Sequence, residues 1–337
     1  MGGHEPGRIC GPGTLGGLVG RESDVAEVRV MLERARLVMI TGLPGVGKTA
    51  VALAAAAGAR FPDGAWLVPL DSVRDGQQLP SVIAAALGLP DQLIRGRPEA
   101  LAGELQDRRL LLVLDTCEHL AAACTDLATS LLLSPAGGVR ILVTSREVLR
   151  VPGGLLVPLD PLPLPDAVAL FGRRAAERVP GFAVTEANED LVAELCGRLD
   201  RLPLAIELAA RQLAYGSLER LRSWLAAGYS FLRQPGDAAG RQESWQAELD
   251  WSRRLCSPDE QLAWARLSLA DGPVGLSAAL AACAGAGLSG TRAEAAVAAL
   301  VTKSVLVMDF DPGGQARFRL PETLRAYGAE MLRELRG

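Results

Sequence analysis

The sequence predicts an α/β fold, in which a parallel sheet with helices on both faces is followed by a helical domain and a winged-helix domain. Three observations predict it. Short apolar runs alternate with helical stretches over the first 160 residues, an order that produces parallel sheets. A proline-rich segment then precedes a region in which the patterns are helical. Finally, two alternating runs around a turn signal come directly before the last helix, as in a winged helix.

Four apolar runs are typical of buried parallel strands, and a fifth is compatible with another strand of the same sheet. Ahead of the first run, residues 18–35 predict a turn and then a helix with Ser23 as its N-cap. The apolar face of that helix consists of Val25, Val28, Leu32 and Ala35. The four strands are 37–40, 65–70, 110–115 and 141–145, the fifth is 155–159, and helices lie around 48–60, 79–87, 98–107 and 118–133.

Prolines and loose polar segments indicate the domain boundaries. Four prolines within residues 158–166 exclude a helix interior or a central strand there, and residues 233–242 form a second break. Runs at 304–310 and 316–320 flank the turn signal DPGG, and a closing helix begins near Pro321. Further helices are expected at 166–178, 187–199, 203–215, 217–227 and within 244–302. The predicted parts are a flexible leader at 1–17, an α/β domain at 18–160, a helical domain at 161–235 and a winged-helix domain at 236–337.

The composition excludes several classes of protein. With 337 residues, 49% apolar and 22% charged, the chain is globular and long enough for two or three domains. No run approaches the roughly 20 apolar residues that span a bilayer, and the N-terminus lacks the apolar core of a signal peptide. The six cysteines form no CxxC pair and only His4 and His119 accompany them, which favours reduced cytoplasmic thiols over a metal cluster. The arginine-rich usage is associated with GC-rich bacterial genomes.

Residues 42–49 read GLPGVGKT, a complete Walker A loop between an apolar strand and an alanine-rich helix. Glycines let the backbone wrap closely enough for successive N–H groups to point at phosphate oxygens. Lys48 is expected near the β- and γ-phosphates, and the Thr49 hydroxyl on Mg²⁺. The alternative is a glycine- and proline-rich turn that matches by chance. Because strand, loop and helix occur in the required order, the motif predicts that the α/β domain is a P-loop nucleotide-binding domain.

Two later strands end in residues suited to the same site. Asp115 ends an apolar run as a Walker B carboxylate does, so it is expected to hold Mg²⁺ opposite Thr49, although a plain strand end is the alternative. The next residue is Thr116, where many P-loop ATPases place a second acid that orients the attacking water, and Glu118 follows two residues on. Hydrolysis is therefore expected to be slow. Arg146, after the fourth strand, matches the oxygens of a γ-phosphate, with an exposed loop arginine as the alternative.

These residues together resemble one family, the NB-ARC nucleotide-switch module of STAND-class signalling ATPases, and most closely its bacterial branch in multidomain transcriptional regulators. The resemblance covers residues 18–335, and its motifs occur in the family's order. The stretches that carry it are LVGRE at 18–22, GLPGVGKTAVALAAA at 42–56, LLLVLDTCEHL at 110–120, ILVTSREVLRVPG at 141–153, RLPLAIELAA at 201–210, and the winged-helix stretches at 249–272, 300–308 and 317–332.

The resemblance implies a site for adenine nucleotide and Mg²⁺. It places adenine and ribose against the backbone near Val19 and Arg21, and it packs Pro203 of the GLPLA-like motif on the nucleotide. On this basis the catalytic candidates are Lys48, Asp115 and Arg146, and the metal ligands are Thr49 and Asp115. The nucleotide-binding candidates are Val19, Gly20, Arg21, Gly42, Pro44, Gly45, Val46, Gly47, Lys48, Thr49, Ala50, Pro203 and Leu204.

The chain departs from the family pattern at two places. Many relatives carry a Met-His-Asp triplet whose histidine contacts the β-phosphate, but the register on LRAY places Leu320, Pro321 and Glu322 there. Pro321 has no N–H to donate, so that contact is missing or supplied elsewhere. The GLPLA-like motif begins with Arg201 instead of glycine, which we expect to be tolerated because Pro203 is retained.

The implied function is a molecular switch, closed with ADP and open with ATP, in which weak hydrolysis resets the switch. Self-association on activation is expected, together with effector and sensor domains or partner proteins, and no membrane contact. Two alternatives remain: a P-loop kinase for a small molecule, and a DNA-binding winged-helix protein. The few cations within residues 258–302 and the net charge of −4 argue against direct contact of this module with nucleic acid.

Overall fold

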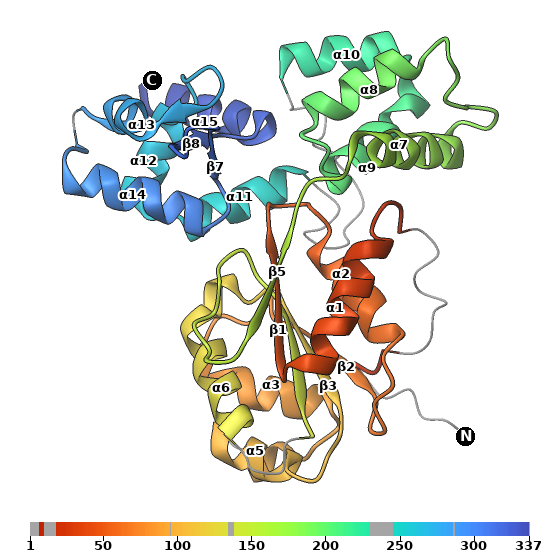
Figure 1. Ribbon diagram of the computed structural model, residues 1–337, viewed down its shortest axis with the longest axis vertical. Helices are drawn as coiled ribbons and strands as arrows, with labels where there is room; N and C mark the ends of the chain where they lie inside the picture. The colour runs from red at the N-terminus through yellow and green to blue at the C-terminus, as the bar shows by residue number, and fades with distance from the viewer. Residues whose placement is uncertain are drawn as a thin grey trace. The chain divides into compact units, whose positions relative to one another are not determined.

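The computed structural model describes residues 7–9, 18–94, 96–133, 138–228, 245–285 and 287–336. By its internal contacts the chain divides into two units. The first consists of Met1–Gly42 and Gly47–Leu159, and the second consists of Leu43–Val46 and Asp160–Gly337 (Figure 1). Most of the expected leader and the expected boundary between 235 and 236 lie outside the described residues. Within the leader, Gly7 accepts a hydrogen bond from the N–H of Leu67, and the N–H of Ile9 donates to Ala65.

The first unit is built on a five-stranded parallel sheet with the order β2-β3-β4-β1-β5. The predicted fold class is therefore confirmed, and the fifth run is a true edge strand. Each strand is nearly continuous in apolar residues because helices cover both faces of the sheet. The strands are β1 (Leu37–Gly42), β2 (Ala65–Pro69), β3 (Leu111–Asp115), β4 (Arg140–Thr144) and β5 (Leu155–Leu159).

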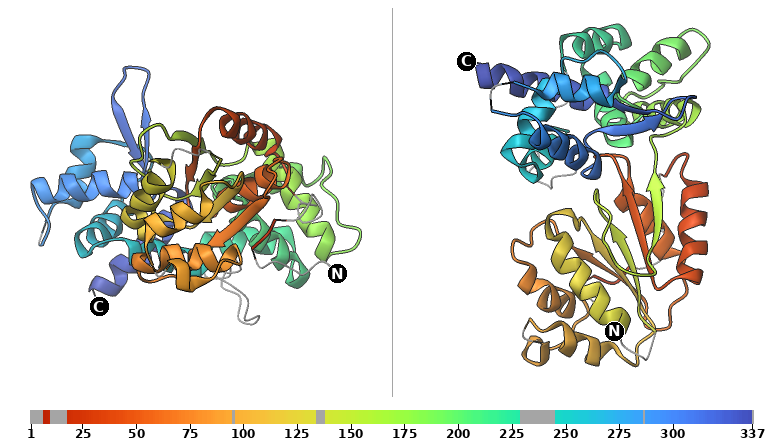
Figure 2. Two further views of the ribbon diagram at one scale, coloured as in Figure 1. Left: turned by 90° about the horizontal axis from the view of Figure 1, so that it is seen from below. Right: turned by 60° about the vertical axis from the view of Figure 1, so that its left-hand side comes forward.

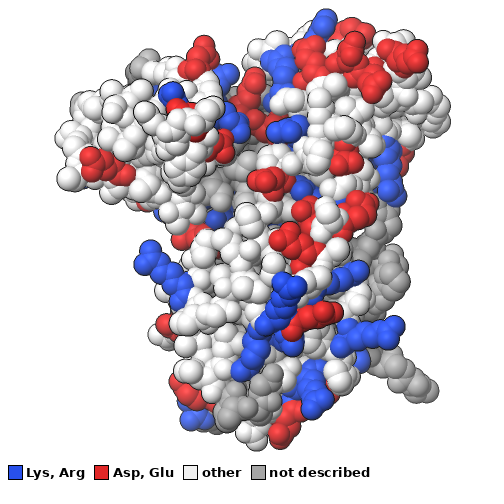
Figure 3. All heavy atoms as spheres, viewed as in Figure 1, with Lys and Arg blue, Asp and Glu red and all other residues white. Residues whose placement is uncertain are grey.

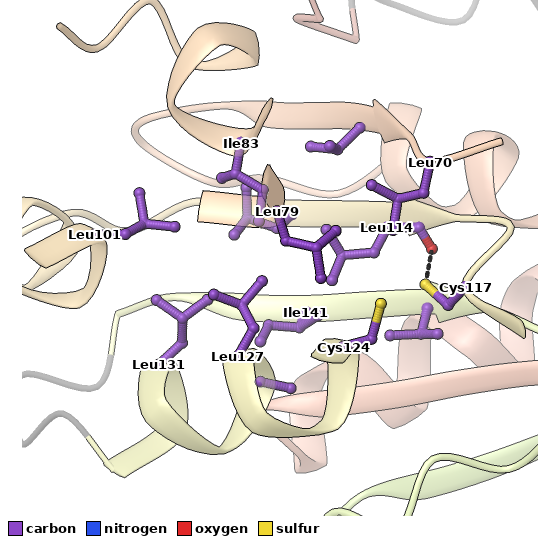
Figure 4. Packing of buried hydrophobic residues seen from close by; sticks show 14 of the residues in the cluster. Leu70, Leu79, Ile83, Leu101, Leu114, Cys117, Cys124, Leu127, Leu131 and Ile141 are labelled. Carbon is purple, nitrogen blue, oxygen red and sulfur yellow. Dashed lines mark hydrogen bonds between the residues drawn. The ribbon is translucent and has the colours of Figure 1, made fainter. Parts of the chain in front are cut away.

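Helices α1 (Glu22–Arg34) and α2 (Lys48–Ala57) lie on one face of this sheet, and α3 (Leu79–Ala86), α5 (Pro98–Leu105) and α6 (Ala121–Leu133) lie on the other (Figures 1 and 2). The latter three form one apolar cluster with alternate strand residues such as Leu114 and Ile141. Figure 4 shows Leu79, Ile83, Leu127 and Leu131 of this cluster, with the thiol of Cys117 donating to the carbonyl of Leu114. Short helices α4 (Asp91–Ile94), η2 (Gly76–Gln78) and η3 (Glu118–Leu120) complete the unit.

Two local expectations about this unit need correction. Ser23 is not an N-cap, because α1 begins at Glu22 and its N-cap residue is Arg21. The helix expected at 166–178 also begins two residues earlier, at Leu164, in the second unit. Pro158 lies in β5, which tolerates it as an edge strand, and α7 (Leu164–Arg178) already contains Pro165 in its first turn, where its missing N–H costs nothing.

The second unit begins with a helical part. Helix α7 packs against α8 (Glu189–Arg198) and α9 (Pro203–Arg211) around buried residues that include Phe171 and Ile206. The motif at 201–210 thus supplies the first turn and the body of α9, with Pro203 as its first residue. The short helix η4 (Gln212–Tyr215) and helix α10 (Leu218–Ala227) follow, and Ser217 caps α10.

A winged helix closes the chain. Its helices are α11 (Trp245–Leu255), α12 (Pro258–Leu267), α13 (Leu276–Cys283), α14 (Thr291–Thr302) and α15 (Glu322–Arg336), and its strands are β6 (Val274–Gly275), β7 (Val307–Phe310) and β8 (Ala316–Arg319). The three strands form an antiparallel sheet in the order β6-β8-β7. The hairpin was predicted, but β6 was not, because two residues carry no periodic signal. The indole of Trp264 donates to the carbonyl of Leu324 at 2.9 Å and joins α12 to α15.

Across the described ranges, the helices are too short or too polar for any of them to traverse a bilayer.

Candidate functional site

The Walker A residues form the loop between β1 and α2, and three of its glycines have positive φ angles. Gly42, Gly45 and Gly47 have φ angles of 148°, 69° and 101°, which residues with a Cβ rarely adopt. Helix α2 begins directly at Lys48, its N-cap is Gly47, and no side chain caps it. Its first turn contains no acidic residue. The α2 N-terminus therefore presents main-chain N–H groups to an anion, which is the geometry of a phosphate cradle.

Lys48 folds back over this loop. Its ammonium donates to the carbonyl of Gly42 at 2.9 Å, so the charge is held above the glycines. Val46 is fully buried at the tip of the loop, and Ala50 lies in the first turn of α2. A separation of six positions thus lets the Lys48 side chain return to the first glycine of the same loop. The loop fits a polyphosphate, because its three glycines have positive φ angles and no side chain caps the helix that follows.

The two predicted metal ligands lie in direct contact. The hydroxyl of Thr49 donates to Oδ1 of Asp115 at 2.7 Å, although the two residues are 66 positions apart. Burial raises the pKa of the Asp115 carboxyl, opposed by the hydroxyls of Thr144 and Thr49 and by the charge of Lys48. A hydroxyl and a buried carboxylate are oxygen ligands of the kind that Mg²⁺ prefers. The pair therefore fits the metal expected beside a P-loop.

Thr144 belongs to this network and was not predicted as a site residue. Its hydroxyl donates to Oδ1 of Asp115 at 2.5 Å and accepts from the N–H of Thr116 at 3.0 Å. Thr116 has a φ of 66°, so the chain turns sharply immediately after the carboxylate. Strand β4 lies between β1 and β3, which explains why its last residue bridges the two motifs. A polar residue at the end of an otherwise apolar buried run was the available signal.

Arg146 is buried at the carboxyl end of β4 and is not an exposed loop residue. Its Nε lies 3.4 Å from Oε1 of Glu118, and the two side chains are 1% and 5% exposed. The sharp turn at Thr116 directs Glu118 into this pair, a direction that the sequence left open. The negative charge of Glu118 also reaches Asp115, whose pKa it helps to raise. Cation and carboxylates are thus gathered at one end of the sheet.

Residues Leu43–Val46 form the tip of the P-loop, which we call the P-loop tip. By its contacts the P-loop tip groups with the second unit. The N–H of Leu204, in the first turn of α9, donates to the carbonyl of Gly45 at 3.2 Å. A Cβ built on Gly45 would lie 2.9 Å from the ring of Trp245 and 3.0 Å from Cβ of Leu204. Gly45 is therefore required both by its φ and by its neighbours. Pro203 and Leu204, two nucleotide-binding candidates, are placed by this contact next to the P-loop tip.

The other candidates lie at the start of α1. Val19 and Gly20 precede the helix, and the guanidinium of the buried Arg21 pairs with Asp24 at 3.0 Å. Because α1 packs against α2, this segment is carried by the helix that neighbours the P-loop helix. Pro44 is buried within the P-loop tip. A cavity of about 660 Å³ lies elsewhere, at the amino ends of β1 and β5 beside Arg34 and Arg36, and is remote from all of these residues.

The departure at 320–322 also has a structural consequence. Leu320 and Pro321 are buried, and Glu322 is the first residue of α15. The main-chain N–H of Glu322 donates to Asp200, an acid that was not singled out in the sequence. The replacement of glycine by Arg201 costs more conformational free energy than expected, because the φ of Arg201 is 55°, in the left-handed region that glycine favours.

The fold and the site define a protein with a P-loop α/β domain and a carboxy-terminal winged helix. Residues 257–333 match the profile of the Winged helix-turn-helix domain family. The fold resembles that of the Walker-type ATPase paby2304 of Pyrococcus abyssi, at 16% identity and a TM-score of 0.63, over 94% of this chain and 96% of that one.

Two relatives from Mycobacterium tuberculosis narrow this class. The uncharacterized protein Rv0894 is 35% identical over 95% of this chain and 82% of its own length, and the present chain belongs to its family. Rv0890c, provisionally named an HTH-type transcriptional regulator, is 36% identical over 90% of this chain. The chain spans only 35% of the length of Rv0890c. These relatives and the winged-helix match agree with the part of the resemblance that concerns bacterial transcriptional regulators with a winged helix.

The expectation of no direct contact with nucleic acid is wrong. The winged helix-turn-helix match and the regulators among the relatives contradict it. The expectation relied on the few cations within residues 258–302 and on a net charge of −4. The net charge sums over both units and does not describe the surface of one domain. On the face shown in Figure 3, basic and acidic side chains are interspersed over both units, so neither sign of charge dominates that face.

Proposed function

We propose that this chain is a nucleotide-dependent switch that binds ADP and ATP with Mg²⁺. One observation carries the proposal: the loop shaped to hold phosphate is also divided between the two units, with its tip held by the second. Whatever the loop binds can therefore change the contacts of Gly45 with Leu204 and Trp245. A difference of a few kcal/mol in such contacts is enough to shift a two-state arrangement by orders of magnitude.

Each residue has a defined task in this proposal. The amides around Val46 and Gly47 and the charge of Lys48 hold the diphosphate, while Thr49 and Asp115 hold Mg²⁺. Thr144 orients Asp115 through its hydroxyl. Residues 18–21 and Pro203 enclose the base. When bound, the nucleotide with its metal supplies the negative charge to which the loop responds.

Arg146 is proposed to distinguish ATP from ADP. Its guanidinium is held by Glu118 at the end of the sheet that carries Asp115, so one further phosphate would offer it a competing partner. Thr116 stands where a second acid would orient water, and the buried Glu118 is paired with Arg146. We therefore propose weak ATPase activity that resets the switch, not rapid turnover.

The wider organisation is also a proposal. We place the nucleotide-binding domain at 18–160, the helical domain at 161–235 and the winged-helix domain at 236–337. Because the chain spans 35% of the length of Rv0890c, it would act beside effector and sensor domains or partner proteins, and would self-associate when activated.

The discriminating experiment compares ADP and ATP binding by calorimetry in Arg146→Ala and in Arg150→Ala, an exposed arginine four residues later. We expect Arg146→Ala to bind ADP within about twofold of the parent chain but to lose about tenfold or more in ATP affinity, as when one charged hydrogen bond is removed. The Arg150→Ala control should match the parent chain for both nucleotides. Equal losses for ADP and ATP in Arg146→Ala would make the arginine structural and remove the proposed discrimination.

A second candidate function is DNA binding through the winged helix, supported by the family match at 257–333 and the regulators among the relatives. It is compatible with the switch, since nucleotide could govern access to the domain. Fluorescence anisotropy with a random-sequence duplex tests it. Binding that weakens steeply between low and physiological salt supports the candidate, and no binding at low salt in any nucleotide state contradicts it.

A further inference from the structure

The turn between α8 and α9 has an unusual backbone. Asp200 and Arg201, consecutive residues of this turn, have φ angles of 53° and 55°. Two left-handed residues in succession reverse the chain directly after α8, and the N–H of Arg201 donates back to Cys196 at 2.9 Å. Neither residue is a glycine, so the conformation costs free energy that other contacts must offset.

The carboxylate of Asp200 provides such contacts at the N-terminus of α15. Its Oδ1 accepts from the N–H of Glu322 at 2.8 Å. Its Oδ2 accepts from the N–H of Thr323 at 2.8 Å and from the Thr323 hydroxyl at 2.7 Å. Thr323 is fully buried. A helix N-terminus carries unsatisfied amides and partial positive charge, so an acid from 122 positions earlier acts as its cap.

Helix α15 is in turn fixed to the rest of the winged helix. Trp264 of α12 donates to the carbonyl of Leu324, and the hydroxyl of Tyr327 donates to Asp250 of α11 at 2.7 Å. A displacement of the first turn of α15 would therefore carry the winged-helix domain with it. Through α15, the contact of Asp200 therefore holds the whole winged-helix domain and not only the first turn of that helix.

The same turn leads to the P-loop tip. Leu202 is the N-cap residue of α9, and the N–H of Leu204 donates to Gly45. Only three residues of chain thus separate Asp200, which caps α15, from Leu204, whose amide donates to the P-loop tip. All of these contacts lie within the second unit, to which the P-loop tip belongs.

We propose that Asp200 is the positioning residue that couples the P-loop tip to the winged-helix domain, through its triple contact with Glu322 and Thr323. The inference rests on the proposed function, because it names how nucleotide at the loop is transmitted. Asp200 itself touches no nucleotide; it sets where α15 begins relative to α9.

The test separates coupling from simple helix capping. In Asp200→Ala the connection is lost, and in Asp200→Ala/Pro321→Asp a local side chain caps α15 without restoring the connection to the turn. Asp190→Ala, which removes an exposed acid from the first turn of α8, is the matched control. Amide hydrogen exchange of 320–327 is measured with and without ADP and Mg²⁺, and ADP affinity is measured by calorimetry.

We expect ADP to slow exchange in 320–327 at least threefold in the parent chain and in Asp190→Ala. Asp200→Ala should still bind ADP within about tenfold yet lose this remote protection. The double variant should recover thermal stability but not the ADP-dependent protection. Full protection in Asp200→Ala, or its recovery in the double variant, would overturn the coupling role. Failure of the parent chain to bind ADP would instead refute the proposed function.

Discussion

Two helix N-termini in this chain differ in what their main-chain amides are offered as a partner. Helix α2 begins after Gly47 with no side-chain cap and no acid in its first turn. Helix α15 begins with its first amides bound to the carboxylate of Asp200. Both ends expose N–H groups that favour negative charge. One end is completed within the protein, and the other is left open for an anion.

The difference shows why a single motif identifies one end and not the other. An open end needs glycines and a lysine in a fixed order, which the sequence displays over eight residues. A completed end needs only one acid at the right place in space, and Asp200 is 122 positions from its partner. A ligand site built from contiguous residues can therefore be predicted from the sequence, whereas a contact between residues far apart in the chain, such as that of Asp200, cannot.

The largest effect is expected from removing the cation beside the N-terminus of α2. Lys48→Ala should weaken ADP binding about ten- to a hundredfold, because charge-assisted contacts contribute about 1.5–3 kcal/mol each. Calorimetry of nucleotide-free protein measures it. The control is Lys303→Ala, which removes the chain's other lysine, an ion-pair partner of Glu260, and should leave ADP affinity unchanged. Equal ADP affinity in Lys48→Ala would show that α2 does not hold phosphate.

A second variant gives the N-terminus of α2 a carboxylate, as Asp200 does for α15. Ala50→Asp places a carboxylate in the first turn of α2, where it can accept from the main-chain amides and repel phosphate. We expect ADP affinity to fall about tenfold while the melting temperature of the nucleotide-free protein holds or rises. The same substitution at Ala57, at the other end of α2, serves as control. Unchanged ADP binding in Ala50→Asp would contradict the assignment of this helix end.

A third variant concerns the buried acid beside the open end. Burial raises the pKa of Asp115 above its ordinary value of 3.8, so its ionised form destabilises the nucleotide-free fold at neutral pH. Asp115→Asn should therefore raise the melting temperature by a few degrees at neutral pH, and the gain should shrink as the pH falls through the raised pKa toward 3.8.

The same variant should weaken Mg·ATP binding more than ADP binding, because a metal ligand is lost. Thermal melts over a pH series and calorimetry measure the two effects, with the exposed Asp126→Asn as control. A lower melting temperature at neutral pH, or equal losses for both nucleotides, would count against this account of Asp115.

The smallest effect concerns the turn that completes α15. Arg201→Gly should stabilise the protein by about 0.5–1 kcal/mol, since the left-handed conformation is costly for arginine and not for glycine. Arg201→Ala keeps the strain and should show no such gain. Urea unfolding measures both. A gain of equal size in Arg201→Ala would mean that the side chain, and not the backbone, is responsible.

Particular residues show how far the sequence could predict this structure. The strands and helices of the parallel sheet and the contact of Thr49 with Asp115 follow from apolar runs and from the rule that parallel strands end at one edge. Thr144, the burial of Arg146 with Glu118, and the Asp200 contact were not predicted. The first two depend on the lateral order of strands and on a sharp turn at Thr116, which no local pattern specifies. The Asp200 contact joins residues 122 positions apart, which no local pattern specifies either.

Calorimetric titration of nucleotide-free protein with ADP and Mg²⁺ tests the central claim most directly. The N-terminus of α2 predicts one ADP bound per chain, with an affinity that falls about ten- to a hundredfold in Lys48→Ala. Absence of any binding heat from well-folded protein at millimolar ADP or ATP would contradict the account.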